Sequence, residues 1–240
     1  MANTFKNSTF RPPTAFGNVT IGILGLLIII GVLSIAACIF MIAAPDYAIE
    51  LDDGESLALG FGLVGLLSIL QIGLRVLCTV CFLIWLYRAF NNLPVLGARG
   101  LEFSPGWAVG WWFIPFANLV KPYQAVKELY LQSDPANRIE EGLVSRKVAS
   151  SEVVSLWWGT FLAFGFSFRL SDALAGSDTR DPSHYFPVAY LVGSILMIVS
   201  AVLAVVMIRR VDLWQTEIVG KQTPNRADVP PPPPTFDEKE

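Results

Sequence analysis

Two stretches of this chain are too long and too apolar to suit a soluble domain. Val19–Ala44 and Phe186–Ile208 contain no charged residue, and each exceeds the about 20 residues that an α-helix needs to cross the hydrocarbon core of a bilayer. Hydrophobic residues make up 53% of the sequence and charged residues 15%, which is a more apolar composition than soluble proteins have. The sequence therefore predicts an integral membrane protein, and the lipid bilayer is its expected partner.

Two further segments complete the prediction of a helical bundle. Ser56–Tyr87 is longer still and is interrupted by two strongly polar residues. Leu156–Leu174 opens with a pair of tryptophans that suits the aromatic belt at a membrane surface, and it carries Arg169 and Asp172 near its far end. We predict an all-α, polytopic membrane protein with four transmembrane helices, at about residues 19–44, 57–87, 156–174 and 186–208.

A cleaved signal is an alternative interpretation of the first apolar run, because Ile35-Ala36-Ala37-Cys38 is similar to the cleavage site of a bacterial lipoprotein. However, apolar residues continue beyond Cys38 to Ala44, and the run is longer than the about 7–15 residues of a signal core. The length therefore favours a retained helix.

The distribution of basic residues predicts how the chain is threaded. The loop PDYAIELDDGES carries five acids and no base, whereas 14 of the 17 Lys and Arg residues lie on the other side if there are four spans. Those 14 are Lys6, Arg11, Arg88, Arg99, Lys121, Lys127, Arg138, Arg146, Lys147, Arg209, Arg210, Lys221, Arg226 and Lys239. Because bases gather on the cytoplasmic side, both termini are expected in the cytoplasm. Residues 1–18 are then a cytoplasmic arm, and residues 211–240 a cytoplasmic, Pro-rich disordered tail.

A tryptophan-rich segment, FSPGWAVGWWFIPFANLVKPY at residues 103–123, admits two interpretations. A full crossing over residues 103–120 would move the bases from Lys121 to Lys147 outside, against the positive-inside rule. Its prolines and glycines also interrupt a helix, and irregular backbone at membrane depth is tolerated only where protein or water covers it. We therefore expect residues 103–133 to form a re-entrant or interfacial element on the cytoplasmic side, with a full crossing as the alternative.

The end of this element is predicted to be an amphipathic helix. In KPYQAVKELYLQSDP, four apolar or aromatic residues recur at three- and four-residue spacing, namely Tyr123, Val126, Leu129 and Tyr130. Such spacing places them on one helical face, and Pro135 ends the pattern. A helix of this kind can lie along the lipid headgroups or pack on the underside of the bundle, and the sequence leaves both open.

The segments WLYRAFNNL and FSPGWAVGWWFIPFANLVKPYQAVKELYLQSDP resemble the signature of a family of bacterial integral membrane proteins defined by a domain of unknown function, number 4328. The matching positions are Arg88, Asn91, Pro105, Gly106, Trp107, Gly110, Trp111, Trp112, Pro115, Asn118, Pro122 and Tyr123. The resemblance implies a domain over about Leu57 to Arg210, within an expected membrane domain of residues 19–210. It also implies several helices in a bacterial inner membrane, and it implies no known activity.

Arg75 is the most unusual residue of the predicted membrane helices. If Trp85 marks the inner boundary, Arg75 lies about 15 Å deeper at 1.5 Å per residue, where a charge is costly and needs a partner. Gln71 and Asp172 are the candidate partners, although Arg169 and Asp172 can also pair with each other at i,i+3. A path for ions, protons or an anionic substrate and a purely structural arginine are both compatible with this position.

The other candidate sites favour structural over chemical roles. The glycines and tryptophans of the motif suit a structural wedge, and Asn118 could cap the amphipathic helix, although a pocket for a lipid headgroup or a small ligand fits the same residues. Cys78-x-x-Cys81 lies in an apolar helix and lacks the further ligands of a zinc site. We predict no catalytic residue, no metal, no cofactor and no nucleic-acid partner, so we do not expect an enzyme.

The leading functional hypothesis is a non-enzymatic membrane scaffold that binds partners at the cytoplasmic face. Prolines 230–234 could bind a protein partner as a polyproline II segment. The alternative is a small transporter or channel component that uses Arg75, for which a homo-oligomer would help because four helices enclose little space. A closed salt bridge at Arg75 would favour the scaffold, and a wetted cavity would favour the transporter.

Overall fold

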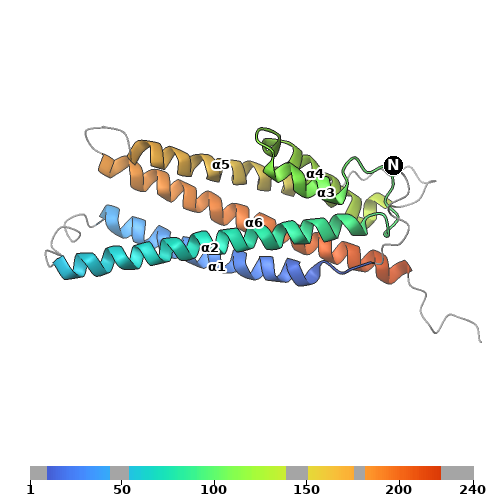
Figure 1. The fold of residues 1–240 in the computed structure, drawn as a ribbon, viewed down its shortest axis with the longest axis horizontal. Helices are drawn as coiled ribbons and strands as arrows, with labels where there is room; N and C mark the ends of the chain where they lie inside the picture. Colours follow the sequence, from blue (N-terminus) through green and yellow to red (C-terminus); the bar gives the residue numbers. More distant parts are fainter. Residues whose placement is uncertain (1–9, 44–53, 139–150, 176–181, 223–240) are drawn as a thin grey trace, which may run out of the picture.

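A computed structural model describes residues 10–43, 54–138, 151–175 and 182–222 of the chain. Within these ranges the fold is all-α, with four long helices in a bundle and short helices between the second and third of them (Figure 1). The long helices are α1 (Thr14–Ala43), α2 (Gly54–Asn92), α5 (Glu152–Ala175) and α6 (Pro182–Gln222). The short helices are α3 (Pro105–Gly110), η2 (Trp111–Phe113), η3 (Ala117–Leu119), α4 (Lys121–Ser133) and η4 (Pro135–Arg138).

The long helices are neighbours in the order α2, α1, α6 and α5. α1 packs along both α2 and α6, and α6 packs along α5. Residues 103–133, here called the hairpin, join the two outer helices at one end of the bundle, because α3 contacts α2 whereas α4 contacts α5 and α6. The amphipathic helix that the sequence predicts is therefore α4, and it packs on the bundle.

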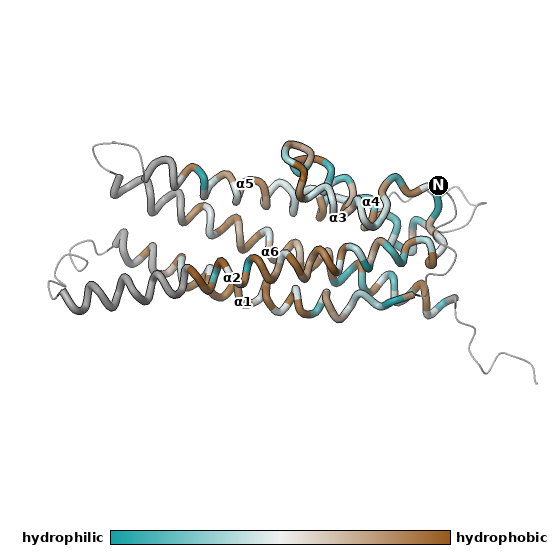
Figure 2. Tube along the Cα trace, viewed as in Figure 1, coloured by the Kyte–Doolittle hydropathy of each residue, from teal (hydrophilic) through white to brown (hydrophobic). Residues whose placement is uncertain are grey.

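Three of the described helices contain a segment long and apolar enough to cross a membrane. These segments are Thr14–Ala36, Ile69–Asn92 and Leu191–Lys221. Large apolar side chains such as Leu33, Ile69 and Ile195 are exposed on them, and hydrophobic residues dominate the middle of α1 and α2 in Figure 2. An apolar surface of this extent is unfavourable in water and favourable in lipid. The chain is therefore a multi-pass membrane protein.

The helices extend beyond the ranges that hydropathy predicts, and α6 differs most. The sequence predicts a helix end at residue 208 and a disordered tail from residue 211, but α6 continues to Gln222. Asp212 and Gln215 are buried, so contacts with neighbouring helices, which hydropathy does not report, stabilise this last part. α1 similarly begins at Thr14, and α2 ends at Asn92. The outer parts of the predicted arm and tail, including prolines 230–234, lie outside the described residues.

A buried polar cluster joins four segments at the hairpin end of the bundle. The side-chain nitrogen of Gln215 donates to the carbonyl oxygen of Ala89 at 3.0 Å and to Oγ of Ser133 at 3.1 Å. Its Oε1 accepts from Nδ2 of Asn92 at 3.1 Å, and Asn92 exchanges two further hydrogen bonds with the backbone of Arg11. Gln215 thus connects α6 with α2 and α4, and Asn92 adds the residues that precede α1.

A second buried contact holds α1, α2 and α6 together one helical turn deeper in the bundle. Nε1 of Trp85 donates to Oδ1 of Asp212 at 2.8 Å, and both residues are buried. Gly17 of α1 lies against this pair, because a Cβ atom at that position would collide with the carboxylate of Asp212. The missing side chain of Gly17 therefore allows α1 to approach α6 closely.

Replacing Gln215 by Leu is expected to lower the free energy of unfolding by about 1–3 kcal/mol, because its buried partners would lose a hydrogen bond without gaining water. Thermal unfolding in detergent measures this change. The matched control is Glu217→Gln on the same helix, which breaks an exposed ion pair with Lys221 and should change stability by less than about 1 kcal/mol. Equal melting of the Gln215 variant and the wild type would contradict a stabilising role for this cluster.

Candidate functional site

The hairpin consists of short helices and reverses its direction within a few residues. Ser104 caps α3, where its Oγ accepts from the N–H of Trp107 at 3.4 Å, and Pro105 lies in the first turn. α3 and η2 together rise only about 15 Å, about half of the hydrocarbon thickness. The chain then reverses at Phe116, whose φ of 62° is rare for a residue with a side chain. α3 and η2 by themselves are therefore too short for a full crossing, and the place of the hairpin relative to the membrane stays a prediction.

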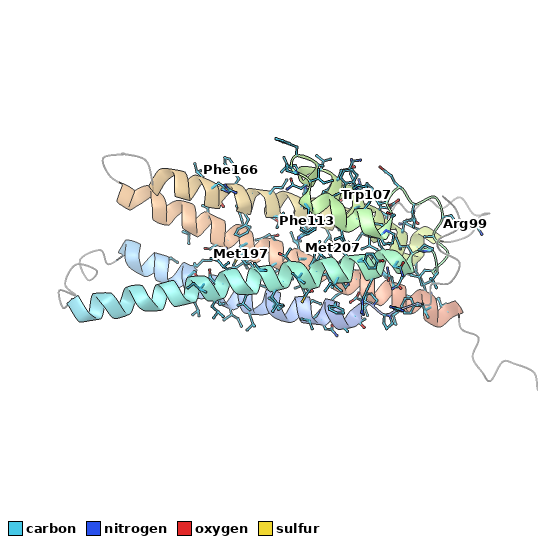
Figure 3. The ribbon with its side chains drawn as sticks, in the orientation of Figure 1. Arg99, Trp107, Phe113, Phe166, Met197 and Met207 are labelled. Carbon is cyan, nitrogen blue, oxygen red and sulfur yellow. The ribbon has the colours of Figure 1, made fainter. Side chains whose placement is uncertain are left out.

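The tip of the hairpin presents large apolar side chains to the outside. Phe113, Phe116 and Leu119 are 71%, 87% and 51% exposed. Trp107 on α3 is also exposed and lies on the same side of the bundle as Phe166 of α5 (Figure 3). Exposed aromatic side chains of this kind suit the boundary between lipid headgroups and acyl chains.

An aromatic cluster holds the inner side of the hairpin. The ring of Trp112 packs edge-to-face on Phe82 of α2, at 5.6 Å between ring centres, and on Trp158 of α5, at 5.7 Å. Trp157 and Phe161 of α5 lie 6.5 and 6.2 Å from the same ring. Trp112 therefore bridges α2 and α5, the two outer helices in the order of neighbours.

Hydrogen bonds fasten the returning part of the hairpin to α5. Nε1 of Trp158 donates to the carbonyl oxygen of Leu119 at 3.0 Å. The hydroxyl oxygens of Tyr123 and Ser155 are 2.9 Å apart, which is a hydrogen bond in which either can donate. The motif residue Tyr123 thus contacts the start of α5, and the tryptophan pair that the sequence places at a membrane boundary contacts both the turn and the cluster.

α4 connects the start of the hairpin with α6. The carboxylate of Glu128 accepts from the backbone N–H groups of Glu102 and Phe103, at 2.6 and 3.0 Å. The hydroxyl of Tyr130 accepts from Arg210 of α6 at 2.9 Å. These bonds close the hairpin on itself and attach it to the bundle.

The structure brings many of the predicted motif residues together around this cluster. The rings of Trp107 and Trp111 are 4.9 Å apart, and Gly110 faces the Trp107 ring, since a Cβ atom there would lie 3.4 Å from it. Arg88 lies farther away, with its guanidinium carbon 4.5 Å from the centre of the Phe16 ring. Of the other motif residues, Pro105 and Pro122 are buried, Asn91 is half-buried, and Gly106, Pro115 and Asn118 are exposed.

Asn118 does not cap the amphipathic helix, contrary to the prediction. The N-cap residue of α4 is Val120, and no side chain accepts a hydrogen bond at that position. A capping side chain must directly precede the helix, but Asn118 lies within η3, three residues before the first residue of α4. The backbone N–H of Asn118 instead donates to the carbonyl oxygen of Ile114 at 3.0 Å and helps to close the turn.

A cavity of about 310 Å³ lies next to the aromatic cluster. Trp112, Trp157 and Phe161 form its wall on the side of the hairpin. Residues from α1, α2 and α6 form other parts of the wall, among them Leu24, Leu27, Cys78, Ser200, Ala201 and Ala204. All four long helices and η2 therefore surround this space, and its volume is at the lower end of the about 300–1,000 Å³ of small-molecule sites.

Arg75 of α2 lies in the wall of the same cavity. Its Nη2 atom is 3.8 Å from Sδ of Met197, which lies along α6 (Figure 3). Its guanidinium carbon is 5.5 Å from the centre of the Phe164 ring on α5. The intramembrane arginine and the tryptophan motif, which the sequence presents as separate candidates, thus meet at one site.

The structure describes the predicted partners of Arg75 only in part. Gln71 is half-buried one turn away on the same helix, and Arg169 is exposed on α5. The side chain of Asp172 lies outside the described residues, so its pairing with Arg75 or with Arg169 stays a prediction.

The two cysteines of α2 are free thiols. Cys78 is half-buried and lines the cavity, whereas Cys81 is buried. In the part of the chain that the structure describes, no three His, Cys, Asp or Glu side chains are grouped to hold a metal ion. The polar chemistry of the cavity therefore comes mainly from the guanidinium of Arg75, beside small hydroxyl and thiol groups.

Sequence reasoning missed several residues that hold this site together. Asp212 and Gln215 fall in the segment that hydropathy assigns to a tail, although their three-residue spacing on one helical face was a usable signal. Phe164 and Met197, which contact the guanidinium of Arg75, give no such signal. An apolar residue in a membrane helix looks the same in sequence whether it faces lipid or a cavity.

Trp112→Ala is expected to lower the free energy of unfolding by about 3–5 kcal/mol, because the change leaves a gap between two helices. Trp107→Ala is the matched control, since Trp107 belongs to the same motif but is 55% exposed, and it should cost less than about 1.5 kcal/mol. Denaturant titration in detergent, followed by circular dichroism, measures both. Equal losses would refute the special role of the Trp112 ring.

The comparison with known proteins agrees with the motif. A family model described as Domain of unknown function (DUF4328) matches residues 50–212, a range that contains α2, the hairpin, α5 and α6 as far as Asp212. No curated protein and no solved structure matches the chain. Because the matched range covers more than half of the 240 residues and includes every signature position, the chain belongs to the family defined by this domain of unknown function.

Proposed function

We propose that this family member crosses a bacterial inner membrane four times, with both termini in the cytoplasm. α5 supports the fourth crossing, because its 24 residues correspond to about 36 Å and it packs along α6. The bases at the hairpin end, such as Arg88, Arg99 and Lys121, support a cytoplasmic location for that end. The hairpin then enters the cytoplasmic leaflet as a re-entrant element, with its apolar tip among the lipids.

Single-cysteine labelling tests this topology, after the three native cysteines have been replaced. In intact cells, a membrane-impermeant thiol reagent is expected to label cysteines placed at Asp53 and Ser177. Cysteines at Asn137 and Lys221, which are exposed, should react only after the membrane has been opened. Labelling at Asn137 from outside would refute the four-span arrangement.

We infer that the protein acts as a non-enzymatic scaffold that binds a partner at the cytoplasmic face. The observation that carries this inference is the fastening of the hairpin. Buried rings and hydrogen bonds attach it to α2, α5 and α6, while Arg99, Glu102 and Asn137 are exposed at the same end. A surface that is already ordered loses little entropy on binding, so a rigid platform of this kind suits recognition.

The polar groups near the hairpin support a non-enzymatic role. Asp212, Asn92 and Gln215 hydrogen-bond to neighbouring groups in the interior, and Glu128 accepts two backbone N–H bonds. Each of them therefore takes part in a structural contact. Acid–base or nucleophilic chemistry would need such a group beside a substrate site.

Transport is the second candidate function, and the position of Arg75 in a cavity wall favours it. A charged residue at membrane depth that faces a cavity is the arrangement expected in a substrate path. However, Trp112 and Trp157 form the cavity wall on the side of the hairpin, so a continuous path on that side would require the hairpin to move, or a homo-oligomer would have to provide another route. Arg75-dependent uptake of an anion by proteoliposomes would decide for this alternative.

A photoreactive amino acid at Arg99 is expected to form a discrete cross-linked product in native membranes, because Arg99 is exposed beside the hairpin (Figure 3). Phe166 is the matched control, since it is 69% exposed on α5 where lipid is the expected neighbour. Mass spectrometry identifies the products, and deletion of residues 223–240 separates the platform from the proline tract. No product at Arg99, or the same product at both positions, would contradict the scaffold role.

A further inference from the structure

We propose that the cavity beside Arg75 binds a long-chain carboxylic acid taken from the membrane. The carboxylate lies against the guanidinium of Arg75, and the acyl chain lies among the apolar and aromatic walls. This site is separate from the exposed platform around Arg99, so the proposal goes beyond the scaffold role and does not depend on it.

Arg75 determines the head group of the ligand. A guanidinium binds a carboxylate through two parallel N–H···O bonds, which a point charge does not reproduce. The neighbours described for Arg75 include the thioether of Met197 at 3.8 Å and the ring of Phe164 at 5.5 Å. A thioether is a weak hydrogen-bond acceptor, so a carboxylate that enters the cavity gives the cation a stronger interaction than this contact does.

The walls of the cavity determine the rest of the ligand. Leu24, Phe82 and Phe161 offer carbon surface to an acyl chain. The hydroxyls of Thr20 and Thr79 donate to carbonyl oxygens of their own helices, at 2.7 and 2.9 Å, and therefore do not create a second polar end. A volume of about 310 Å³ suits one chain with a small head better than a two-chain lipid.

The depth of Arg75 favours a carboxylic acid over a phospholipid. Arg75 lies inside Ile69–Asn92, the segment of α2 that is long and apolar enough to cross a membrane, whereas a phospholipid phosphate stays ionised at the membrane surface. A carboxylic acid can enter the hydrocarbon in its neutral form, and a nearby cation stabilises the carboxylate form in the cavity relative to the same form in lipid. A carboxylic acid can therefore reach a guanidinium at this depth, whereas a phospholipid phosphate would first have to leave the membrane surface.

The test is the quenching of tryptophan fluorescence by a brominated stearic acid, with the full chain in phosphatidylcholine nanodiscs. Trp112 and Trp157 line the cavity, so saturable quenching is expected for the wild type. Arg75→Gln should weaken binding at least about tenfold through the lost charge-assisted bonds, and Arg75→Lys should weaken it less. Arg169→Gln, which removes an exposed arginine of α5, is the matched control and should bind as the wild type does.

Control ligands distinguish the binding of a carboxylic acid from the binding of a phospholipid or of a free anion. The methyl ester of the brominated acid should bind the wild type as weakly as the acid binds Arg75→Gln. Equal binding of acid and ester, or of acid by wild type and Arg75→Gln, would overturn the proposal. Effective competition by phosphatidylglycerol or by inorganic phosphate would also overturn it, because the site would then belong to a phospholipid or to a free anion.

A second variant keeps the test decisive if Arg75→Gln does not fold, which its unfolding transition would reveal. Ala201→Leu adds volume to the cavity wall and keeps Arg75, so saturable quenching should be lost. Quenching that persists in Ala201→Leu would overturn the proposal. Cross-linking at Arg99 reports the scaffold role separately, so failure of one proposal is distinguishable from failure of the other.

Discussion

The position of the Trp112 ring is the contact on which the rest of this structure depends. α2 and α5 are the first and last of the four long helices when these are taken in order of contact. Trp112 packs on Phe82 of α2 and on Trp158 of α5. Both contacts are edge-to-face, at separations that aromatic pairs prefer. Since a ring in this geometry contacts both helices at once, it determines the spacing between them, and the cavity beside Arg75 follows from that spacing.

Polar and close-packed contacts complement this aromatic cluster because lipid supplies no hydrophobic force between membrane helices. The bond from Trp85 to Asp212 and the cluster around Gln215 supply interactions that lipid cannot replace. Gly17 lets α1 approach this region, and Gly31 does the same farther along, where a Cβ atom would lie 2.6 Å from Met197. The hairpin end is thus held by buried polar bonds in addition to its aromatic and apolar core, whereas close packing at Gly31 serves farther along the bundle.

The tryptophan motif therefore has two structural consequences. Its outer residues, such as Trp107 and Phe113, are exposed toward the expected lipid boundary. Its inner residue, Trp112, is both a wedge between helices and part of a cavity wall. A wedge and a ligand pocket are alternatives when the motif is considered as sequence. In the fold they are compatible, because the element that separates two helices also bounds the space between them.

Hydropathy and charge by themselves determined that this chain is a helical membrane protein with an irregular element in residues 103–133, because the transfer energy of a side chain and the length of a helix are local properties. The tertiary structure decided what depends on neighbours. Arg75 and Trp112 line one cavity, and α6 continues to Gln222 through buried contacts. Val120, and not Asn118, occupies the N-cap position of α4. Each of these outcomes depends on which faces of which helices meet, and a single sequence does not contain that information in any local pattern.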